Sequence, residues 1–240
     1  MIDEQAMPID SAALENVISR LRGVDDPDVG VQIVLQRVVD STHRLFGMNG
    51  AGLMFVDDGQ ALRYVAASDE AARILEIAQE EHGVGPCVDA LVHEVVVTTR
   101  DIAADERYRA IAPIVVPHGV RSVIGMPVRL GGTTIGSLNV YCNAPTDWDD
   151  TDIAALGAFA EVIEAIIGTA VLTHRQGNVV EQLEFALQNR VSIERAVGVV
   201  MNRESVGPVE AFNVLRSQAR AQRRKVADVA NEILAGVTAS

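Results

Sequence analysis

Two neighbouring segments near the middle of the chain alternate between hydrophobic and other residues, and this alternation constrains the fold more than any other feature. Residues 121–130 place a hydrophobic side chain at every second position: Ile124, Met126, Val128 and Leu130. Gly131 and Gly132 then turn the chain into residues 133–142, TTIGSLNVYC. A period of two with a glycine turn predicts an antiparallel hairpin. Pro127 cannot donate a ladder hydrogen bond, so we expect it where the sheet is irregular or unpaired.

A helix and another hairpin precede these segments. Hydrophobic residues recur every three or four positions over residues 31–46, VQIVLQRVVDSTHRLF, which is the spacing of an amphipathic helix. Residues 51–57 and 61–67 have the composition of strands, with a tight turn at Asp58 and Gly59 between them. Residues 31–67 therefore combine one predicted helix with one predicted hairpin.

Further helices flank both predicted hairpins. One is expected over residues 69–81, closed by Gly83 and followed by a loop with the sequence VGPC. A long apolar helix begins at Asp149 or Asp150, since either residue is a suitable N-cap. The order of helix, hairpin, helices, hairpin and long helix predicts an α+β fold, in which a largely antiparallel sheet is flanked by helices.

The two parts of the chain differ in charge. Residues 1–177 hold 12 basic and 26 acidic side chains, a net charge of −14, whereas residues 178–240 hold 8 and 7, a net charge of +1. Within the second part, residues 216–225, RSQARAQRRK, carry five cations and no acid. This division predicts two functional units, of which the second meets a polyanion. A solvated charged corner is the alternative explanation of the cations.

The second part is predicted to consist of three helices. The first runs from about Asn178 to Glu204, and Pro208 stands at the first position of the next. The third follows the cations and carries apolar residues at helical spacing: Val226, Val229, Ala230, Ile233 and Leu234. With the helix break near Gly177, these patterns divide the chain into an N-terminal tail (1–11), a first domain (12–177) and a three-helix domain (178–240).

The composition favours a globular protein of the cytosol. The acidic N-terminus, MIDEQAMPID, lacks the basic and then apolar pattern of a secretory signal, and we expect no membrane span. Cys87 and Cys142 stand apart, without a CxxC pair or a histidine at zinc-ligand spacing, so we expect neither a disulfide framework nor a metal site. Because His93 and His118 are isolated as well, no residue is predicted to be catalytic or to bind haem.

Five segments of the first domain occur in an order that is typical of one family. They are GAGLMFVDD, YVAASDE, GVGPCVDAL, DERY and GVRSVIGMPVRLGGTTIGSLNVY. Through them, roughly residues 12–172 resemble a GAF domain, a small-molecule sensor fold. The resemblance implies that a ligand is held between the sheet and its covering helices. The sequence identifies neither this ligand nor a cofactor.

The second domain carries three motifs in order: ERAVGVVMNRE, EAFNVLR and RRKVADVA. Through them, residues 178–235 resemble an ANTAR domain, the RNA-binding module of bacterial transcription antitermination regulators, for which a GAF sensor is a familiar partner. Val197 stands where the family commonly has Lys, while Ala219 and Arg223 replace the usual Ser and Asn. These departures predict an RNA affinity or sequence choice that differs from the family norm.

The resemblance implies a ligand-responsive regulator that binds RNA stem-loops in nascent transcripts. Two ANTAR units would hold two stem-loops and let polymerase continue into downstream genes. Arginine suits such loops because guanidinium groups fork onto phosphates and stack on unpaired bases. The cations expected to face the RNA are Arg190, Arg216, Arg220, Arg223, Arg224 and Lys225.

Two other functions are compatible with parts of the sequence. Three short helices with a basic turn also describe a helix-turn-helix DNA-binding regulator, although Pro208, Val209 and Glu210 form a poor base-reading N-terminus. A GAF-type methionine sulfoxide reductase would use Cys87 and Cys142.

The two long helices predict a homodimer. Residues 150–175 and 178–203 are long for helices of a compact domain. The second carries apolar residues at spacings that suit helix pairing: Val180, Leu183, Leu187 and Val191. The heptad pattern is imperfect, because Glu194 occupies a position where an apolar residue is expected.

Overall fold

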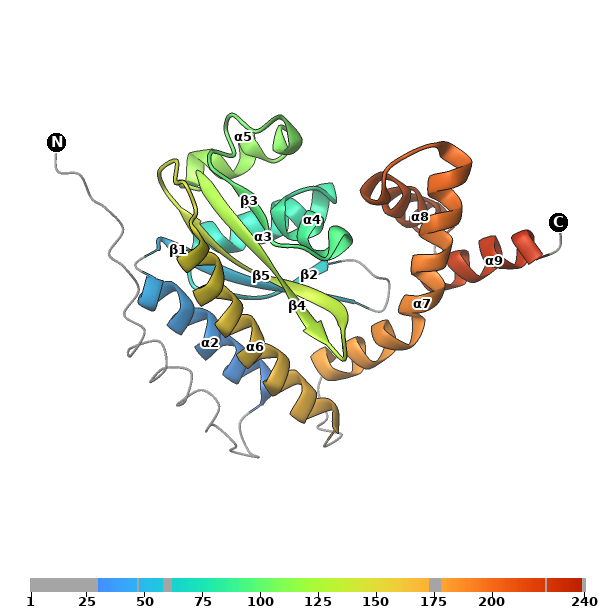
Figure 1. Ribbon diagram of the computed structural model, residues 1–240, viewed down its shortest axis with the longest axis horizontal. Coiled ribbons are helices and arrows are strands. Elements are labelled where there is room, and N and C mark those ends of the chain that lie inside the picture. The colour runs from blue at the N-terminus through green and yellow to red at the C-terminus, as the bar shows by residue number, and fades with distance from the viewer. Residues whose placement is uncertain (1–29, 47, 58–61, 173–177, 223, 239–240) are drawn as a thin grey trace.

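The computed structural model describes residues 30–46, 48–57, 62–172, 178–222 and 224–238. Residues 30–172 form a unit built on one sheet, the sheet unit, and residues 178–238 form a unit of helices, the helical unit (Figure 1). The described α-helices of the sheet unit are α2 (Val31–Phe46), α3 (Glu70–His82), α4 (Pro86–His93), α5 (Ala112–Val115) and α6 (Asp150–Leu172). Its strands are β1 (Gly50–Val56), β2 (Leu62–Ala67), β3 (Val97–Thr99), β4 (Ser122–Leu130) and β5 (Thr133–Cys142).

The five strands form one antiparallel sheet in the order β2-β1-β5-β4-β3. The antiparallel strand pairs of both predicted hairpins are confirmed. The turn between β4 and β5 uses Gly131 and Gly132 at φ values of 58° and 85°, whereas the turn predicted at Asp58 and Gly59 lies outside the described residues. Glycine adopts such positive φ angles without a steric penalty. The prediction for Pro127 is also confirmed. On one side of β4, the neighbouring strand β3 pairs only as far as Gly125, so Pro127 has no strand partner there among the described residues. On the other side, the register between β4 and β5 shifts just after Val128.

Helices cover both faces of the sheet, as the α+β prediction requires. α2 and α6 pack against each other and against one face, while α3 and α4 cover the other (Figure 1). Of the two candidate N-cap residues of α6, Asp149 is the one that caps the helix. Its Oδ1 accepts hydrogen bonds from the backbone N–H groups of Thr151 (2.8 Å) and Asp152 (2.9 Å). This cap fixes where the long helix begins.

By length and composition, α6 is apolar enough to cross a membrane, whereas the sequence led us to expect no membrane span. The helix nevertheless carries Glu161 and Glu164, and Glu164 Oε1 accepts a hydrogen bond from the backbone N–H of Arg129 (2.7 Å). Its buried residues are Ala155, Leu156, Phe159, Ala160, Val162, Ile163, Ile167 and Ala170. Since most of these belong to the core that α6 shares with the sheet, we treat α6 as a core helix.

α3 and α4 follow each other at a sharp corner. The side chain of Asp69 caps α3 by accepting from Ala72 N (2.7 Å), and Gly83 ends it in the left-handed conformation, at φ 65°. The sequence VGPC was predicted to form a loop. This prediction is wrong from Pro86 onward, because Gly85 is the N-cap of α4 and Pro86 is its first residue. Proline suits that position, since the first N–H of a helix has no partner within the helix.

The helical unit consists of α7 (Asn178–Glu204), α8 (Pro208–Gln222) and α9 (Val226–Thr238), which confirms the three predicted helices. Its core gathers apolar residues from all three: Ile193, Ala196, Val200, Ala211, Phe212, Leu215, Ala219, Val226, Ala227, Val229 and Ala230. The predicted domain boundaries near residues 11 and 177 fall outside the described residues and stay predictions.

Candidate nucleic-acid interface

The corner between α8 and α9 exposes Arg224 and Lys225 to solvent. The backbone is held on both sides of this corner. Arg224 N donates to Ala219 O (2.9 Å), and Lys225 O accepts from the N–H groups of Asp228 (3.1 Å) and Val229 (3.3 Å). Because Val229 belongs to the core of the helical unit, the two cations sit on a firmly anchored turn.

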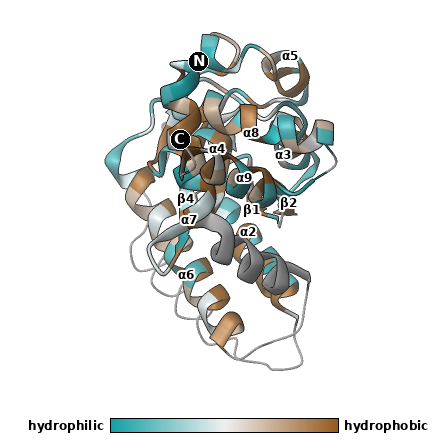
Figure 2. Ribbon diagram, turned by 90° about the vertical axis from the view of Figure 1, so that its right-hand side faces the viewer, coloured by the Kyte–Doolittle hydropathy of each residue, from teal (hydrophilic) through white to brown (hydrophobic). Residues whose placement is uncertain are grey.

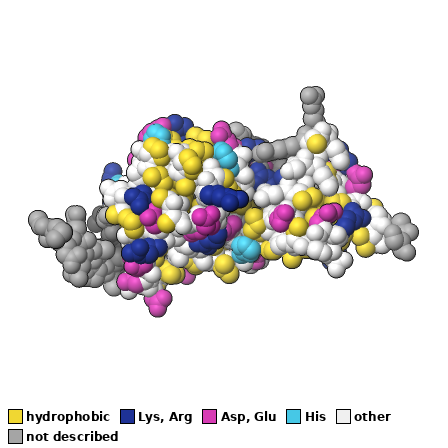
Figure 3. Space-filling model, turned by 90° about the horizontal axis from the view of Figure 1, so that it is seen from above, with side chains coloured by type: hydrophobic (Ala, Val, Ile, Leu, Met, Phe, Trp, Pro, Cys, Tyr) yellow, Lys and Arg dark blue, Asp and Glu magenta, His cyan; other side chains and the backbone are white. Residues whose placement is uncertain are grey.

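Arg224 makes two local contacts at this corner. Its Nη1 donates to Gln222 Oε1 (3.0 Å) and forms an ion pair with Glu232. The two ion-paired side chains are 39% and 65% exposed, and exposed ion pairs contribute only about 0–1 kcal/mol. A phosphate can therefore replace Glu232 at small cost. Figure 3 shows Lys and Arg interspersed with Asp and Glu over the visible face, so the basic corner is a local feature.

The other predicted RNA contacts have different outcomes. The side chains of Arg190, Arg220 and Arg223 lie outside the part of the chain that the structure describes, and their assignment stays a prediction. Arg216 is described, and only 8% of it is exposed. The structure therefore places Arg216 apart from the exposed corner of Arg224 and Lys225.

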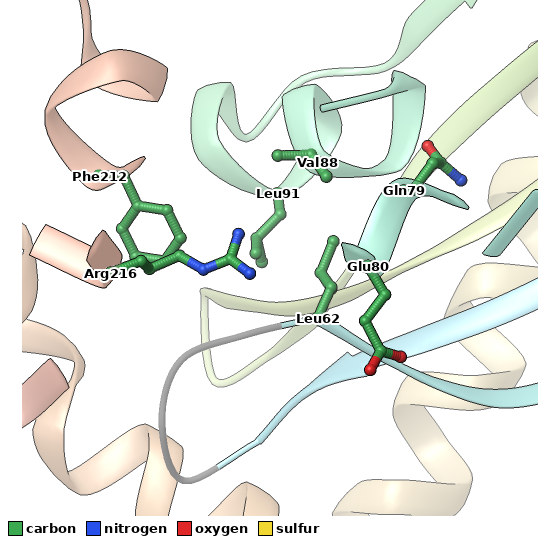
Figure 4. Close-up of a pocket in the computed structure, with 7 residues that line it drawn as sticks. All are labelled: Leu62, Gln79, Glu80, Val88, Leu91, Phe212 and Arg216. Carbon is green, nitrogen blue, oxygen red and sulfur yellow. The ribbon is translucent and has the colours of Figure 1, made fainter. Parts of the chain in front are cut away.

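Arg216 lies where α8 packs on the sheet unit. It extends from α8 past Phe212 towards Leu62 and Glu80 (Figure 4). Its guanidinium carbon is 6.0 Å from the centroid of the Phe212 ring, within the range of a cation–π interaction. At Gly83, an added Cβ would lie 3.0 Å from the guanidinium, so the glycine that ends α3 also leaves room for Arg216. An RNA contact by Arg216 would require α8 to leave the sheet unit.

The contact between the two units is mainly apolar. Phe212 of α8 lines one hollow with Val88 and Leu91 of α4, and a second with Leu91 and Val92. Asn213 Nδ2 adds a long hydrogen bond to Gly83 O (3.4 Å). Figure 2 shows hydrophobic and hydrophilic residues alternating along the described helices, as expected of helices with one buried side. The sheet unit and α8 therefore share a packed interface.

A second surface feature of the helical unit is a groove between the end of α7, α8 and α9. It has a volume of about 220 Å³ and is lined by Arg203, Gln218, Gln222, Val229, Glu232, Ile233 and Gly236. These residues were not predicted to form a site, because most of them lie outside the run of cations at residues 216–225. The spacing of Gln218 and Gln222, four residues apart on one helix, is the signal that would have pointed to a shared face.

A buried polar cluster lies between the sheet and the corner of α3 and α4. Gln79 Nε2 donates to Glu76 Oε2 (3.3 Å) and to Cys87 Sγ (3.2 Å), and Asn139 Nδ2 reaches Glu76 Oε1 and Cys87 Sγ (3.0 Å). Asn139 Oδ1 is buried without a hydrogen-bond partner among the described residues. Gln79 also lines the hollow that holds Arg216, so the cluster borders the interface with α8.

Burial governs protonation in this cluster. It raises the pKa of Glu76 to about 8, although a hydrogen bond from Asn139 opposes the shift. Burial, with a further contribution from the Glu76 charge, raises the pKa of the Cys87 thiol well above its ordinary value. Both groups are therefore protonated near neutral pH. Within the described residues, no three His, Cys, Asp or Glu side chains are placed to hold a metal ion.

Sequence comparisons assign both units to known families. The family model of the GAF domain matches residues 31–167, and that of the ANTAR domain matches residues 181–234. No curated protein has a sequence that matches this chain.

Similar solved structures cover the sheet unit. A domain of a putative two-component sensor histidine kinase from Sinorhizobium meliloti 1021 is 18% identical and covers 62% of this chain and 100% of its own, with a TM-score of 0.52. The GAF domain of a phosphoenolpyruvate-protein phosphotransferase from Coxiella burnetii is 15% identical and covers 69% and 96%, with a TM-score of 0.56. Free methionine-R-sulfoxide reductase from Neisseria meningitidis is 22% identical and covers 65% and 90%, with a TM-score of 0.52. At these identities the likeness shows the fold alone.

Proposed function

Because the chain belongs to the GAF domain family and carries an ANTAR domain after it, we propose that it binds paired RNA stem-loops and regulates transcription antitermination in response to a signal. GAF domains are sensors, and ANTAR domains are RNA-binding antitermination modules. The observation that carries the proposal is the ANTAR match over residues 181–234, directly after the sensor. Such a regulator meets nascent transcripts, and we place it in the cytosol.

The RNA contact is proposed to centre on the corner of Arg224 and Lys225. Both side chains are exposed on an anchored turn, and the partner of Arg224 is an exposed carboxylate that a phosphate can replace. Cations bind phosphates regardless of sequence, so this corner supplies affinity and orientation. Arg190, Arg220 and Arg223 extend the predicted RNA surface.

The sensor, that is, the GAF domain in the sheet unit, is proposed to act through α8. In the docked arrangement Arg216 is buried against the sensor, and the nearby sensor carries most of the negative charge of the chain. Both features weaken RNA binding, so the docked form is the weaker binder. A signal that favours undocking would strengthen RNA binding by shifting the equilibrium between the two arrangements.

The polar cluster of Glu76, Gln79, Cys87 and Asn139 is the proposed entry point of that signal. It lies between the sheet and its covering helices, where buried Asn139 Oδ1 is left to accept a hydrogen bond. A polar small molecule at this position would move Gln79, which is shared with the hollow around Arg216.

Thiol catalysis is a weaker alternative. The thiolate is the reactive form of cysteine, and burial raises the pKa of Cys87 well above its ordinary value. The fold is shared with a methionine sulfoxide reductase, yet the ANTAR domain points to a regulatory protein without catalysis.

A helix-turn-helix mode of DNA binding also fits poorly. The recognition helix of that motif reads bases with its N-terminal residues. Here Pro208 and Phe212, at the start of α8, line a hollow with Leu91 and Val92 of the sensor. The start of α8 is therefore turned towards the sensor.

Capture of RNA by the purified full chain tests the proposal. Total RNA is passed over the immobilised protein, the bound RNA is sequenced, and the enriched sequences are titrated in parallel as RNA hairpins and as duplex DNA. We expect enrichment of stem-loops and tighter binding to RNA. The control is a folded full-chain variant with Arg224→Glu and Lys225→Glu, which should lose the enrichment. Equal capture by both proteins, or tighter binding to duplex DNA, would contradict the proposal.

A further inference from the structure

The groove between α7, α8 and α9 has no role in the function proposed so far. We propose that it holds one unpaired nucleobase of the bound RNA, next to the cations that hold the phosphates. This inference rests on the proposed function, because it names the part of the RNA that a second site on the same domain recognises.

The size of the groove suits a single ring system. Its volume is about 220 Å³, whereas pockets for drug-sized ligands measure roughly 300–1,000 Å³. Val229, which is buried, and Ile233, which is half-buried, stand four residues apart on α9 and give the groove an apolar side. A flat base can lie against such a side, as unpaired bases do on apolar and aromatic surfaces of RNA-binding proteins.

The polar lining of the groove matches the edge of a base better than a phosphate. Gln218 and Gln222 each offer one acceptor and two donor hydrogens, Glu232 offers acceptors, and Arg203 offers donors. A phosphate only accepts hydrogen bonds, and the carboxylate of Glu232 would repel it. A nucleobase carries donors and acceptors side by side, and amide side chains pair with such edges in a bidentate manner.

The groove lies beside the phosphate-binding corner. Arg224 joins the two sites, because its Nη1 contacts Gln222 Oε1 (3.0 Å) and pairs with Glu232. A phosphate that takes Arg224 away from these partners frees the oxygens of Gln222 and Glu232 for the base that follows in the chain. Binding of the backbone at the corner would therefore prepare the groove for its base.

The groove also stays accessible when α8 is docked on the sensor. At about 100° per residue, Gln218 and Gln222 point roughly 200° and 240° around α8 from Arg216, which faces the sensor. Both glutamines and Arg203 are exposed. The base groove and the sensor contact thus occupy different sides of the same helix.

Selection from a hairpin library tests this inference. The probe is an RNA hairpin with a fixed stem and a randomised loop, selected by the full-length protein and by its Gln218→Ala, Gln222→Ala variant. We expect the wild type to prefer one base at one loop position, and the variant to lose about tenfold in that discrimination. The slope of affinity against salt should stay unchanged, because the phosphate contacts remain.

A matched control uses Asn231→Ala, which removes an exposed amide of α9 that does not line the groove. This variant should keep the base preference of the wild type. If the double glutamine variant, folded as judged by its melting temperature, also keeps that preference at every loop position, the base groove is refuted while RNA binding stands. If the wild type retains no hairpin above the unselected library, the proposed function itself fails, and the inference falls with it.

Discussion

Arg224 and Arg216 belong to the same basic run of sequence, yet they have opposite surroundings. Arg224 lies on an exposed turn, with a solvent-facing carboxylate as its partner. Arg216 is 8% exposed and lies between Phe212 and the corner of α3 and α4. Charge alone does not distinguish the two residues, because the difference comes from the docking of α8 on the sensor.

The salt dependence of RNA binding is the first prediction. In an Arg224→Ala, Lys225→Ala variant, the slope of log affinity against log salt should flatten by about 0.7 per lost contact, or ~1.4 in all. Folding should survive, because neither side chain belongs to the core. Fluorescence titrations of one hairpin at several salt concentrations measure the slope. Arg109→Ala, which removes an exposed cation of the sensor, should leave it unchanged. An unaltered slope in the double variant would show that these two cations are solvated and do not contact RNA phosphates.

Glu76 is a buried carboxyl that the fold accommodates through a glycine. A Cβ at Gly52 of β1 would collide with the Glu76 carboxylate, so the strand needs a residue without a side chain there. The pKa of Glu76 is raised to about 8 by burial, from an ordinary value of 4.5. The folded chain therefore keeps a proton that the unfolded chain loses at lower pH.

This difference predicts how stability depends on pH. Between about pH 4.5 and 8, only the folded state binds the proton, so the free energy of unfolding should fall as pH rises, by up to ~1.4 kcal/mol per pH unit. The Glu76→Gln variant should lack this pH dependence of the free energy of unfolding, and it should be more stable than the wild type towards pH 8. Urea unfolding at pH 5, 6, 7 and 8 measures it, with exposed Glu161→Gln as the control. Parallel pH profiles of the wild type and Glu76→Gln would contradict the assignment.

Among the elements, α4 carries the connection between sensor and ANTAR domain. One of its sides packs on the sheet through Cys87 and Val88, and Val92 contacts the cores of both units. The short helix α4 lies between the polar cluster and α8. A displacement of α4 would therefore change its packing against α8 directly.

Breaking this contact should strengthen RNA binding. In Val92→Asp a carboxylate would enter the apolar hollow beside Phe212 and next to Glu194, which disfavours the docked arrangement. RNA affinity should rise roughly fivefold or more, the usual lower range of coupling between two sites. Val95→Asp adds the same charge at an exposed position and should not raise it. The melting temperature of each variant shows that the sensor is intact. Unchanged or weaker RNA binding by folded Val92→Asp would refute autoinhibition.

The sequence predicted most of the elements, and its failures have physical causes. Both hairpins and the long helices have strong periodicities and identifiable caps such as Asp149. α4 was missed because Gly85 and Pro86 resemble a turn, although the same residues can start a helix. The burial of Arg216 and the groove around Gln218 depend on contacts between residues distant in sequence. The spacing of Gln218 and Gln222 indicates only a shared helix face, and no local pattern shows which distant residues pack beside it.

At the scale of the whole molecule, an acidic sensor is joined to a nearly neutral RNA-binding unit. Residues 1–177 carry a net charge of −14, and residues 178–240 carry +1. If RNA binds at the α8–α9 corner as proposed, we expect this asymmetry to keep RNA away from the sensor. Two exposed apolar side chains, Leu172 at the end of α6 and Val191 on α7, are 83% and 56% exposed. They lie on the helices from which we predict dimerisation.

The full chain is expected to be a homodimer in solution. Pairing of α6 and α7 between two chains would cover Leu172 and Val191, and it would bring two ANTAR domains together for two stem-loops. Light scattering at micromolar concentration, with and without RNA, measures the mass. The side chains of Val180, Leu183 and Leu187 lie outside the described residues, so the mass is the more direct test. A monomeric mass under both conditions would contradict the prediction.

Transcription through a terminator tests the central claim most directly. A leader sequence recovered by RNA capture is placed before its terminator, and the fraction of transcripts that continue past it is measured with purified polymerase, with and without the full chain. We predict that the protein raises this fraction, that Val92→Asp raises it further, and that the Arg224→Glu, Lys225→Glu variant has no effect. If the wild-type protein binds the leader and leaves the fraction unchanged, the chain is an RNA-binding protein but not an antitermination regulator.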